Sequence, residues 1–384
     1  MKKNALLFSI MLITMLLLSG CWNYREIDKL AIVSGLAIDK NAQGDQFLLT
    51  AEIIDLKETM TQSKIASRKI EAKGESIFDA MRNMIKISAK KLYWSHAKAI
   101  VVSKDVATQD IVSIVDWISR DHEARITLNL FVSKEQTASE LLFQQSVTTD
   151  IRSFEMEDML MGNRSLSKAP NVKVYEFMND LSEEGISGIL PALGITMNMD
   201  EKTAELSGTA VFKKEKFIGF LDEEDSKFLL FVKDKIKGGV YTIKVEEESP
   251  NEIITLEIFK NKTKITPVYN NDILSIMIST TTEVAIEEQN TTNNYIDEEG
   301  RKKLISIAEK TLEQDVENTI KKVQQDFGSD IFGFGRIVKA EMPSLWKTMD
   351  KKWDTIFKDL EVHVNSEIKI KNSSLTSAPL KVGD

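Results

Sequence analysis

The sequence predicts an α+β protein of two to three domains, with mixed and antiparallel sheets and packed helices. Three observations favour this fold class. The 384 residues are too many for one compact hydrophobic core. Apolar segments of strand length alternate with amphipathic segments of helical length over 30–142. The last third has one long segment of strict alternation, followed by one long apolar stripe at helical spacing.

The first elements are a strand pair and a capped helix. β-branched and apolar residues fill 30–39 and 46–55 on either side of a polar turn, which is typical of two strands. Ser76, with Asp79 three positions later, has the spacing of a helix start. Further expected elements are a strand or loop over 63–74, strands over 98–103 and 124–133, and a helix over 110–119. The expected buried faces are Ile77, Phe78, Met81, Met84 and Ile85 in the first helix and Ile111, Ile114, Val115 and Ile118 in the second.

The middle of the chain is less regular. Two helices are expected over 150–163 and 171–185, followed by a meander of three strands. The turns of this meander fall near Asp200 and Lys214. A helix is then expected to begin after the meander and to end at Gly238, because glycine commonly ends a helix.

The last third has the clearest pattern. Seven apolar or β-branched residues alternate along one strand, and 252–260 is an expected antiparallel neighbour. Pro343 suits the first turn of a helix over 343–357, and 360–371 alternates as a closing strand. The alternating set is Leu274, Ile276, Ile278, Thr280, Thr282, Val284 and Ile286. The long helical stripe is Leu304, Ala308, Leu312, Val316, Ile320, Val323 and Phe327, and it stops at Gly328.

These elements predict the following organisation of the chain. Residues 1–20 form a signal peptide, and 22–195 form an N-terminal α+β domain, in which a division into two units near 145–170 stays open. Residues 200–372 form a C-terminal α+β domain that contains a long strand over 272–288 and a long helix over 298–327. A flexible tail over 373–384 follows.

The leader has the features of a bacterial lipoprotein signal. Lys2 and Lys3 precede an apolar run over 5–18, which is shorter than the roughly 20 residues of a spanning helix. The residues Leu18-Ser19-Gly20 then lead directly to Cys21. We therefore expect cleavage between Gly20 and Cys21 and a diacylglycerol thioether on the Cys21 sulfur. An ordinary secretion signal or an uncleaved anchor is the weaker alternative, because cysteine is otherwise absent from the chain.

Composition excludes several classes of function. The formal net charge is -9, and loss of the two leader lysines leaves 48 basic and 59 acidic residues, or -11. Such an acidic body is repelled by nucleic acid and by anionic lipid, so membrane contact needs the lipid anchor. The single cysteine excludes an intramolecular disulfide, and with only 3 histidines a Cys/His zinc site is disfavoured as well.

No motif predicts catalysis, a metal or a cofactor. His122 begins a sequence like that of zinc proteases, but Ile126 stands where the second histidine is required. The GFGRIV segment at Gly333 lacks the third glycine of a dinucleotide fingerprint. His96 is expected to be packed and hydrogen-bonded, and His363 to be exposed on an alternating strand. Two facing carboxylates, which glycoside hydrolysis needs, leave no trace in a sequence.

Four segments together resemble the Ger(x)C family, the lipoprotein C subunits of bacterial spore germinant receptors. They are CWNYREIDKLAIVSGLAIDK at 21–40, two stretches at 74–107 and 116–142, GTAVFKKEKFIGFLDEEDS at 208–226, and 330–370 with its DIFGFG start and paired tryptophans. The family positions present in the first segment are Cys21, Trp22, Glu26, Gly35 and Asp39, with Asn23 where the family usually has Asp. The resemblance covers nearly the whole chain.

The resemblance implies a multi-domain α+β protein with no known catalytic activity and no cofactor. Its implied partners are the membrane, through S-diacylglycerol on Cys21, and the two other receptor subunits, both of them membrane proteins. The implied location is the outer face of the cell membrane and the inner membrane of the spore. There the complex responds to nutrients and starts germination.

Two other functions stay open. A solute-binding lipoprotein would capture a small nutrient itself and would need a cleft between two lobes. An exported cell-wall hydrolase would need a cleft with two close carboxylates. Neither alternative has a motif in the sequence, and direct binding of a small molecule by this chain is undecided at this level.

Overall fold

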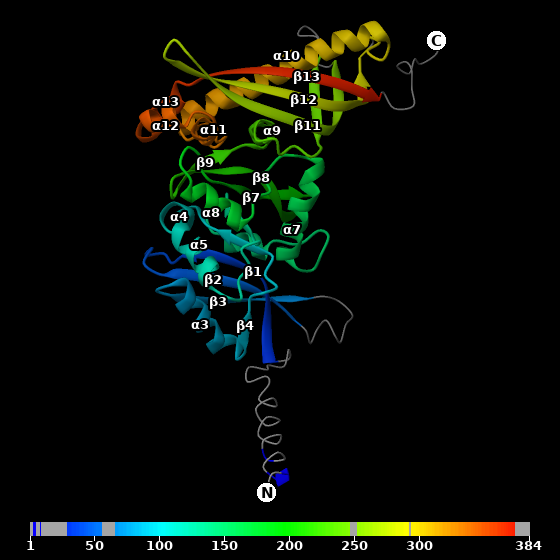
Figure 1. Ribbon diagram of the computed structural model, residues 1–384. Helices are drawn as coiled ribbons and strands as arrows, with labels where there is room; N and C mark the ends of the chain where they lie inside the picture. The colour runs from blue at the N-terminus through cyan, green and yellow to red at the C-terminus, as the bar shows by residue number, and fades with distance from the viewer. Residues whose placement is uncertain are drawn as a thin grey trace, which may run out of the picture.

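The computed structural model describes residues 29–55, 66–245, 252–291 and 293–372, together with Lys3, Asn4 and Phe8 (Figure 1). The strands are β1 Leu30–Lys40, β2 Phe47–Ile54, β3 Ser67–Gly74, β4 Lys91–Tyr93, β5 Ala99–Val102, β6 Asn129–Ser133, β7 Ile189–Asn198, β8 Glu201–Lys213, β9 Lys216–Leu221, β10 Val240–Lys244, β11 Ile253–Asn270, β12 Ile273–Asn290 and β13 Glu361–Asn372. The helices are α3 Ile77–Ser88, α4 Lys104–Gln109, α5 Ile111–Arg120, α6 Ser139–Phe143, α7 Arg152–Gly162, α8 Val174–Ser182, α9 Glu223–Val232, α10 Glu298–Lys322, α11 Phe334–Glu341, α12 Pro343–Met349 and α13 Trp353–Lys358.

These strands form two sheets. A nine-stranded sheet has the order β3-β2-β1-β5-β6-β7-β8-β9, with β4 beside the start of β1. Its centre is parallel from β1 through β5 and β6 to β7, and both flanks are antiparallel. A four-stranded sheet has the order β10-β11-β12-β13, in which β13 runs parallel to β12. The predicted class of mixed and antiparallel sheets with packed helices is therefore confirmed.

Helices cover both faces of the large sheet, and this is why β1 is almost continuously apolar. Leu36 and Ile38 pack with α3 and α5 on one face. Ala37, between them, points to the other face and packs with α6 and α7. Figure 1 shows α3 and β4 at the end of the molecule where β1 begins, and the four-stranded sheet at the opposite end.

Helix α10 lies along the four-stranded sheet and buries the stripe that the sequence predicts. Leu304, Ala308, Leu312 and Val316 are fully buried in the core that this sheet shares with α9 and α11. The helix ends at Lys322 and continues as one π-helical turn to Phe327, where Gly328 takes a φ of 51°. Only the last five residues of the predicted helix therefore depart from α-helical geometry.

Three glutamates of α10 also close the outer edge of β13. The backbone N–H of Ile368 donates to Glu309 at 2.9 Å, that of Ser366 to Glu313 at 2.9 Å, and that of Val364 to Glu317 at 3.3 Å. An edge strand otherwise presents unpaired N–H groups to solvent or to another chain. We call these three residues and their hydrogen bonds the glutamate ladder.

Several local predictions are wrong, each for a physical reason. Helix α9 ends at Val232 and not at Gly238, because Asp234 takes a left-handed φ of 54°. The helix predicted over 343–357 is two helices joined by a 3-10 turn at Asp350–Lys352. Phe78 is 47% exposed, and Ala80 takes its place on the buried face of α3. His96 is exposed beside the ring of Tyr93 and is not packed.

Two further observations bear on the organisation of the chain. Strands on both sides of residue 200 belong to the nine-stranded sheet, so the predicted boundary between 195 and 200 stays a proposal. No helix in the described ranges is both long enough and apolar enough to cross a bilayer.

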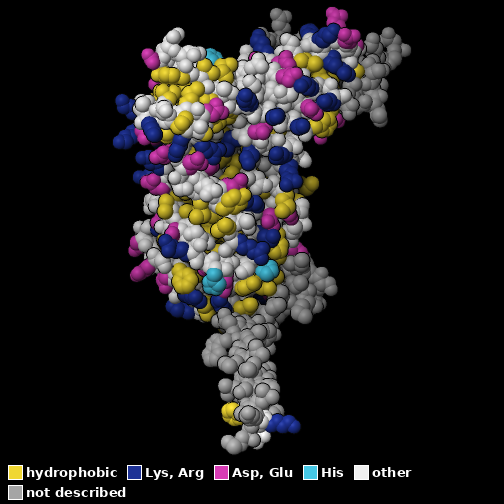
Figure 2. Space-filling view, in the orientation of Figure 1, with side chains coloured by type: hydrophobic (Ala, Val, Ile, Leu, Met, Phe, Trp, Pro, Cys, Tyr) yellow, Lys and Arg dark blue, Asp and Glu magenta, His cyan; other side chains and the backbone are white. Residues whose placement is uncertain are grey.

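Figure 2 shows both signs of charge interspersed over the viewed face, with apolar side chains gathered in patches.

Candidate functional site

The predicted lipidation and cleavage residues, Gly20 and Cys21, lie outside the described residues. Within the described ranges, no group of three or more His, Cys, Asp or Glu side chains is placed to hold a metal ion. His122 is 88% exposed in its side chain and lies 3.8 Å from the Glu123 carboxylate. His363 is exposed on β13, as its strand phase predicts.

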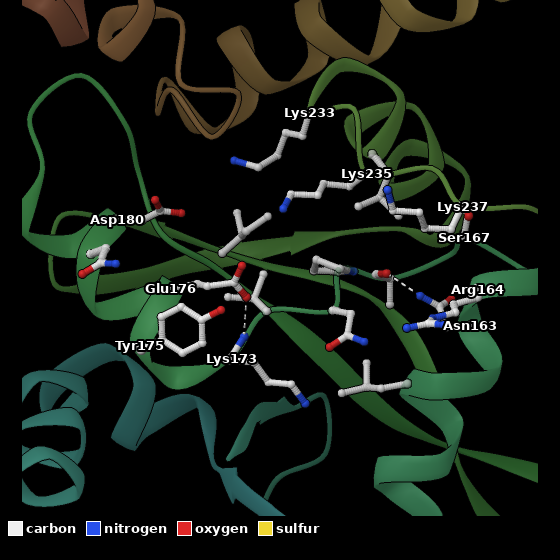
Figure 3. A pocket seen from close by; sticks show the side chains of 18 of the residues that line it. Asn163, Arg164, Ser167, Lys173, Tyr175, Glu176, Asp180, Lys233, Lys235 and Lys237 are labelled. Carbon is white, nitrogen blue, oxygen red and sulfur yellow. Dashed lines mark hydrogen bonds between the residues drawn. The ribbon is translucent and has the colours of Figure 1, made fainter. Parts of the chain in front are cut away.

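The structure contains a pocket that no sequence motif predicts. Its volume is about 650 Å³, and it is lined by the loop after α7, by α8, by the segment after α9 and by one residue of α11. Its cationic lining residues are Arg164, Lys173, Lys233, Lys235, Lys237 and Arg336, and its acidic ones are Glu176, Asp180 and Glu183. Figure 3 labels most of these side chains around the hollow, namely Arg164, Lys173, Lys233, Lys235, Lys237, Glu176 and Asp180.

A tight loop after α7 forms one wall. The buried Asn163 side chain donates to the carbonyl of Ala169 at 2.5 Å and accepts from the N–H of Lys168 at 3.0 Å. Ser167 then donates its hydroxyl to the Gly238 carbonyl at 2.6 Å, which ties this wall to the segment after α9. A Cβ at Gly238 would lie 2.7 Å from the Arg164 carbonyl oxygen, so the approach of the two segments requires glycine there.

The start of α8 forms the lower wall. The Glu176 carboxylate accepts from the Lys173 backbone N–H at 2.9 Å, so this acid caps its own helix. The Lys173 ammonium donates to the Asn129 side chain at 2.6 Å and points away from the hollow (Figure 3). Both groups therefore have hydrogen-bond partners that fix their positions, while each keeps its own charge.

The end of α8 meets α11 through an ion-pair cluster. The Arg336 guanidinium lies 3.5 Å from Asp180 and 3.5 Å from Glu183. Burial raises the pKa of Asp180, while the positive charges of Lys233 and Arg336 oppose this rise. The two carboxylates face the two positive charges of Arg336 and Lys233, so this end of the pocket is close to electrically balanced.

Lys233 is the most enclosed cation of the pocket. Lys233 as a whole is only partly buried, but its ammonium group is surrounded by protein. This group donates a hydrogen bond to the Ile331 carbonyl at 3.0 Å. Burial lowers the pKa of the Lys233 ammonium, and the nearby charge of Asp180 opposes that shift. A cation held in this way interacts strongly with any anion that enters, because solvent screens it poorly.

The remaining cations are not balanced. Among the residues that the structure describes, no hydrogen bond or ion pair engages the charged ends of Arg164, Lys235 and Lys237. All three are exposed. In a chain with a net charge of -9, the pocket therefore concentrates positive charge that the molecule as a whole lacks.

A buried carboxylate fixes the segment that carries Arg336. Asp330 is 2% exposed and accepts from the N–H groups of Gly333, Phe334 and Gly335 and from the Trp353 indole at 2.8 to 3.2 Å. Burial raises the pKa of Asp330, and these four donors oppose the rise by stabilising the carboxylate. This residue begins the DIFGFG segment, and its carboxylate satisfies three backbone N–H groups at the start of α11.

The loop after α8 packs directly on that segment. A Cβ at Gly185 would lie 2.5 Å from the backbone of Gly335, and its own φ is 76°. The Gly185 carbonyl also accepts from the Arg336 N–H at 2.9 Å. This close approach explains why both positions are glycine and why Arg336 reaches the end of α8.

Sequence reasoning missed this pocket because it extended α9 through the lysines. On a helix, alternate lysines would point in different directions around the axis. Instead, the helix ends before the left-handed Asp234, and the residues up to the glycine pair Gly238-Gly239 form a loop. In this loop, Lys233 and Lys235 both reach the pocket. The pair of glycines directly after the lysines was the available signal.

Comparison with known protein families gives two matches that together cover most of the chain. Residues 23–195 match the family described as spore germination protein N-terminal domain. Residues 207–374 match the family described as spore germination B3/GerAC like, C-terminal. The pocket takes residues from both matched regions. The loop after α7 and helix α8 belong to the first region, and the lysines after α9 and Arg336 belong to the second.

Individual relatives match over almost their whole length. Spore germination protein B3 of Bacillus subtilis (strain 168) is 26% identical over 381 residues, which are 96% of this chain and 98% of the relative. Spore germination protein KC of the same organism is 22% identical over 405 residues, covering 99% of this chain and 98% of that one. The crystal structure of the GerBC protein has a TM-score of 0.57 and 22% identity, covering 88% of this chain and 97% of that chain. This last likeness shows the shared fold.

Proposed function

This chain belongs to the GerAC-like family of spore germination proteins, the C subunits of germinant receptor complexes, and on this premise we propose that it is a lipid-anchored, non-enzymatic subunit. The single observation that carries the family is the match of both family models in order along one chain. As a receptor subunit it associates with the other subunits of its complex. The proposal adds the anchor on Cys21, the outer face of the membrane and the nutrient signal.

The leader supports the anchor. The residues Leu18-Ser19-Gly20-Cys21 have the pattern of a lipoprotein signal, and two acyl chains hold a protein stably at a bilayer where one does so only marginally. Eight residues separate Cys21 from Leu30, and the nine residue steps from one to the other span about 30 Å when fully extended. An anchored body would therefore keep the start of β1, with α3 and β4 beside it, close to the membrane (Figure 1).

Anchoring would act through concentration. A body confined near its integral membrane partners meets them at a much higher effective concentration than a free one, without any new contact. An acidic body with a net charge of -9 has no general attraction to anionic lipid, so the proposal assigns membrane attachment to the acyl chains. It assigns no catalytic residue.

The test replaces Cys21 with alanine in the chain as it is made by the spore-forming cell. The expected result is that the protein leaves the membrane fraction and that the nutrient response of the spores falls. Asn23→Asp is the matched control, because it changes the same segment while keeping the lipoprotein pattern. Retention of Cys21→Ala in the membrane together with an unchanged nutrient response would overturn the proposed anchor.

One observation favours a second function, which is capture of a small solute by this subunit itself. The pocket of about 650 Å³ has the size typical of ligand sites and lies where two matched regions meet. Capture of a solute is compatible with the role of a receptor subunit.

A further inference from the structure

We propose that the pocket between α8 and the segment after α9 binds a small organic dianion, such as a dicarboxylate or a phosphate monoester. This inference concerns the folded body and does not depend on the lipid anchor. It assigns a ligand class to a receptor subunit for which the family match itself gives none.

The cations come from two segments of the chain. Figure 3 shows the side chains of Lys233 and Lys235 reaching into the hollow from the segment after α9. Arg164 belongs to the loop after α7, which lies next to Lys237 and is joined to that segment by the hydrogen bond between Ser167 and Gly238. An anion in the hollow can therefore meet cations from both segments, and two negative charges match this arrangement better than one.

The charge of the pocket is unbalanced where the ligand would sit. Arg336 is neutralised by Asp180 and Glu183, at the far end of α8. Lys235, Lys237 and Arg164 have no anionic partner among the described residues. Unpaired cations in a concave site focus the electrostatic field on that site, even though the chain as a whole is acidic.

The apolar part of the lining limits the ligand further. Val172, Ile189 and Leu230 contribute aliphatic surface to the same pocket. These side chains suit a short carbon skeleton between the acidic groups, whereas a fully hydrated ion would gain nothing from them. The volume of about 650 Å³ admits a metabolite-sized molecule and leaves no room for a folded partner.

Binding would also join the two matched regions. Arg164 belongs to the region matched by the N-terminal family model, and Lys235 and Lys237 to the region matched by the C-terminal one. A ligand held by both adds a contact to the existing hydrogen bond between Ser167 and Gly238. Bound ligand should therefore raise the unfolding temperature of the chain, since it binds the folded state alone.

The experiment uses the mature chain in detergent micelles and measures binding by ligand-observed NMR and by thermal unfolding. Three probes are compared, namely succinate, glycerol 3-phosphate as a phosphate monoester, and succinamide as the uncharged analogue of succinate. Succinate, glycerol 3-phosphate or both should bind saturably and raise the unfolding temperature, and succinamide should do neither. Binding by succinate alone assigns dicarboxylates, and binding by glycerol 3-phosphate alone assigns phosphate esters.

Matched variants locate the site. Lys235→Ala with Lys237→Ala should raise the Kd about tenfold or more, the size expected for losing a charge-assisted hydrogen bond. Lys310→Ala with Lys347→Ala removes the same total charge from exposed positions outside the pocket and should leave the Kd unchanged. Lys235→Arg with Lys237→Arg should retain binding, which separates loss of charge from loss of fold.

Asp180→Asn tests the sign of the ligand charge. Removing a carboxylate from the pocket should tighten the binding of an anion, because the repulsion between the two is lost. Weaker binding in this variant would show that Asp180 contacts a cationic group, and it would overturn the assignment to an anion. The proposal is also overturned if neither charged probe binds, or if both double alanine variants bind alike.

Discussion

Replacing Asp330 with asparagine tests whether one buried carboxylate holds together the segment that carries Arg336. The aspartate accepts four hydrogen bonds, from Gly333 and Phe334 at one oxygen and from Gly335 and the Trp353 indole at the other. Asparagine has nearly the same shape but only one acceptor oxygen. Its amide nitrogen would therefore face two donors in a site that is 2% exposed.

The magnitude follows from these contacts. A buried donor left without an acceptor costs about 1–3 kcal/mol, and two donors are affected. Relief of the cost of burying the carboxylate offsets part of this loss, in keeping with the raised pKa of Asp330. We expect the free energy of unfolding to fall by about 2–4 kcal/mol.

Urea unfolding followed by tryptophan fluorescence measures this loss. Trp353 donates to Asp330 itself, and Trp346 lies 5.3 Å from Trp353 between ring centroids, so the emission reports on this region. Asp326→Asn is the matched control, because Asp326 is exposed and lies four residues before Asp330 in the sequence. A change below about 1 kcal/mol, similar to that of the control, would refute the assignment of Asp330 as the residue that holds this segment.

Two further predictions concern other carboxylates. Burial alone would raise the pKa of Glu52, but hydrogen bonds from Ser153 and Ser67 and the charge of Lys69 outweigh burial and lower it. The stabilisation from ionised Glu52 is therefore present above the ordinary glutamate pKa of about 4.3 and is lost as the pH falls below it. Glu52→Gln should flatten the acid side of the stability profile measured by urea unfolding, and an unchanged slope would contradict this. In the glutamate ladder, changing Glu309, Glu313 and Glu317 to alanine should speed hydrogen exchange at the amides of Val364, Ser366 and Ile368 about tenfold or more, whereas Glu341→Ala should not. Equal exchange rates in both variants would show that the ladder does not protect this edge.

The sequence predicts much of the fold, because the spacing of its apolar residues shows which face of each strand or helix is buried. The alternation from Leu274 to Ile286 and the stripe from Leu304 to Ile320 each fall on one buried face, as strand and helix geometry require. The pairing of the strands is less visible, since the contact between β12 and β13 joins residues 86 apart, such as Thr280 and Ser366. Periodicity carries no information on which distant strand lies alongside.

The candidate pocket was beyond sequence reasoning for a related reason. Its cations are held by contacts distant in sequence, such as Ser167 with Gly238 and Lys233 with Ile331. Only the end of α9 had a local signal in the sequence, which is the glycine pair Gly238-Gly239 after the lysines. Cys21 is the opposite case, because the prediction of its lipidation rests wholly on the residues directly before it. Cys21 itself lies outside the described residues.

The glutamate ladder has a geometric consequence for how helix and strand are aligned. Glutamates four residues apart on α10 rise by about 6.0 Å, and N–H groups two residues apart on β13 advance by about 6.6 Å. The two spacings agree closely enough for three successive rungs and drift apart with every additional one. A slip of one residue in either α10 or β13 would therefore break all three hydrogen bonds of the glutamate ladder together. In this way the helix fixes the register of β13 from outside the sheet.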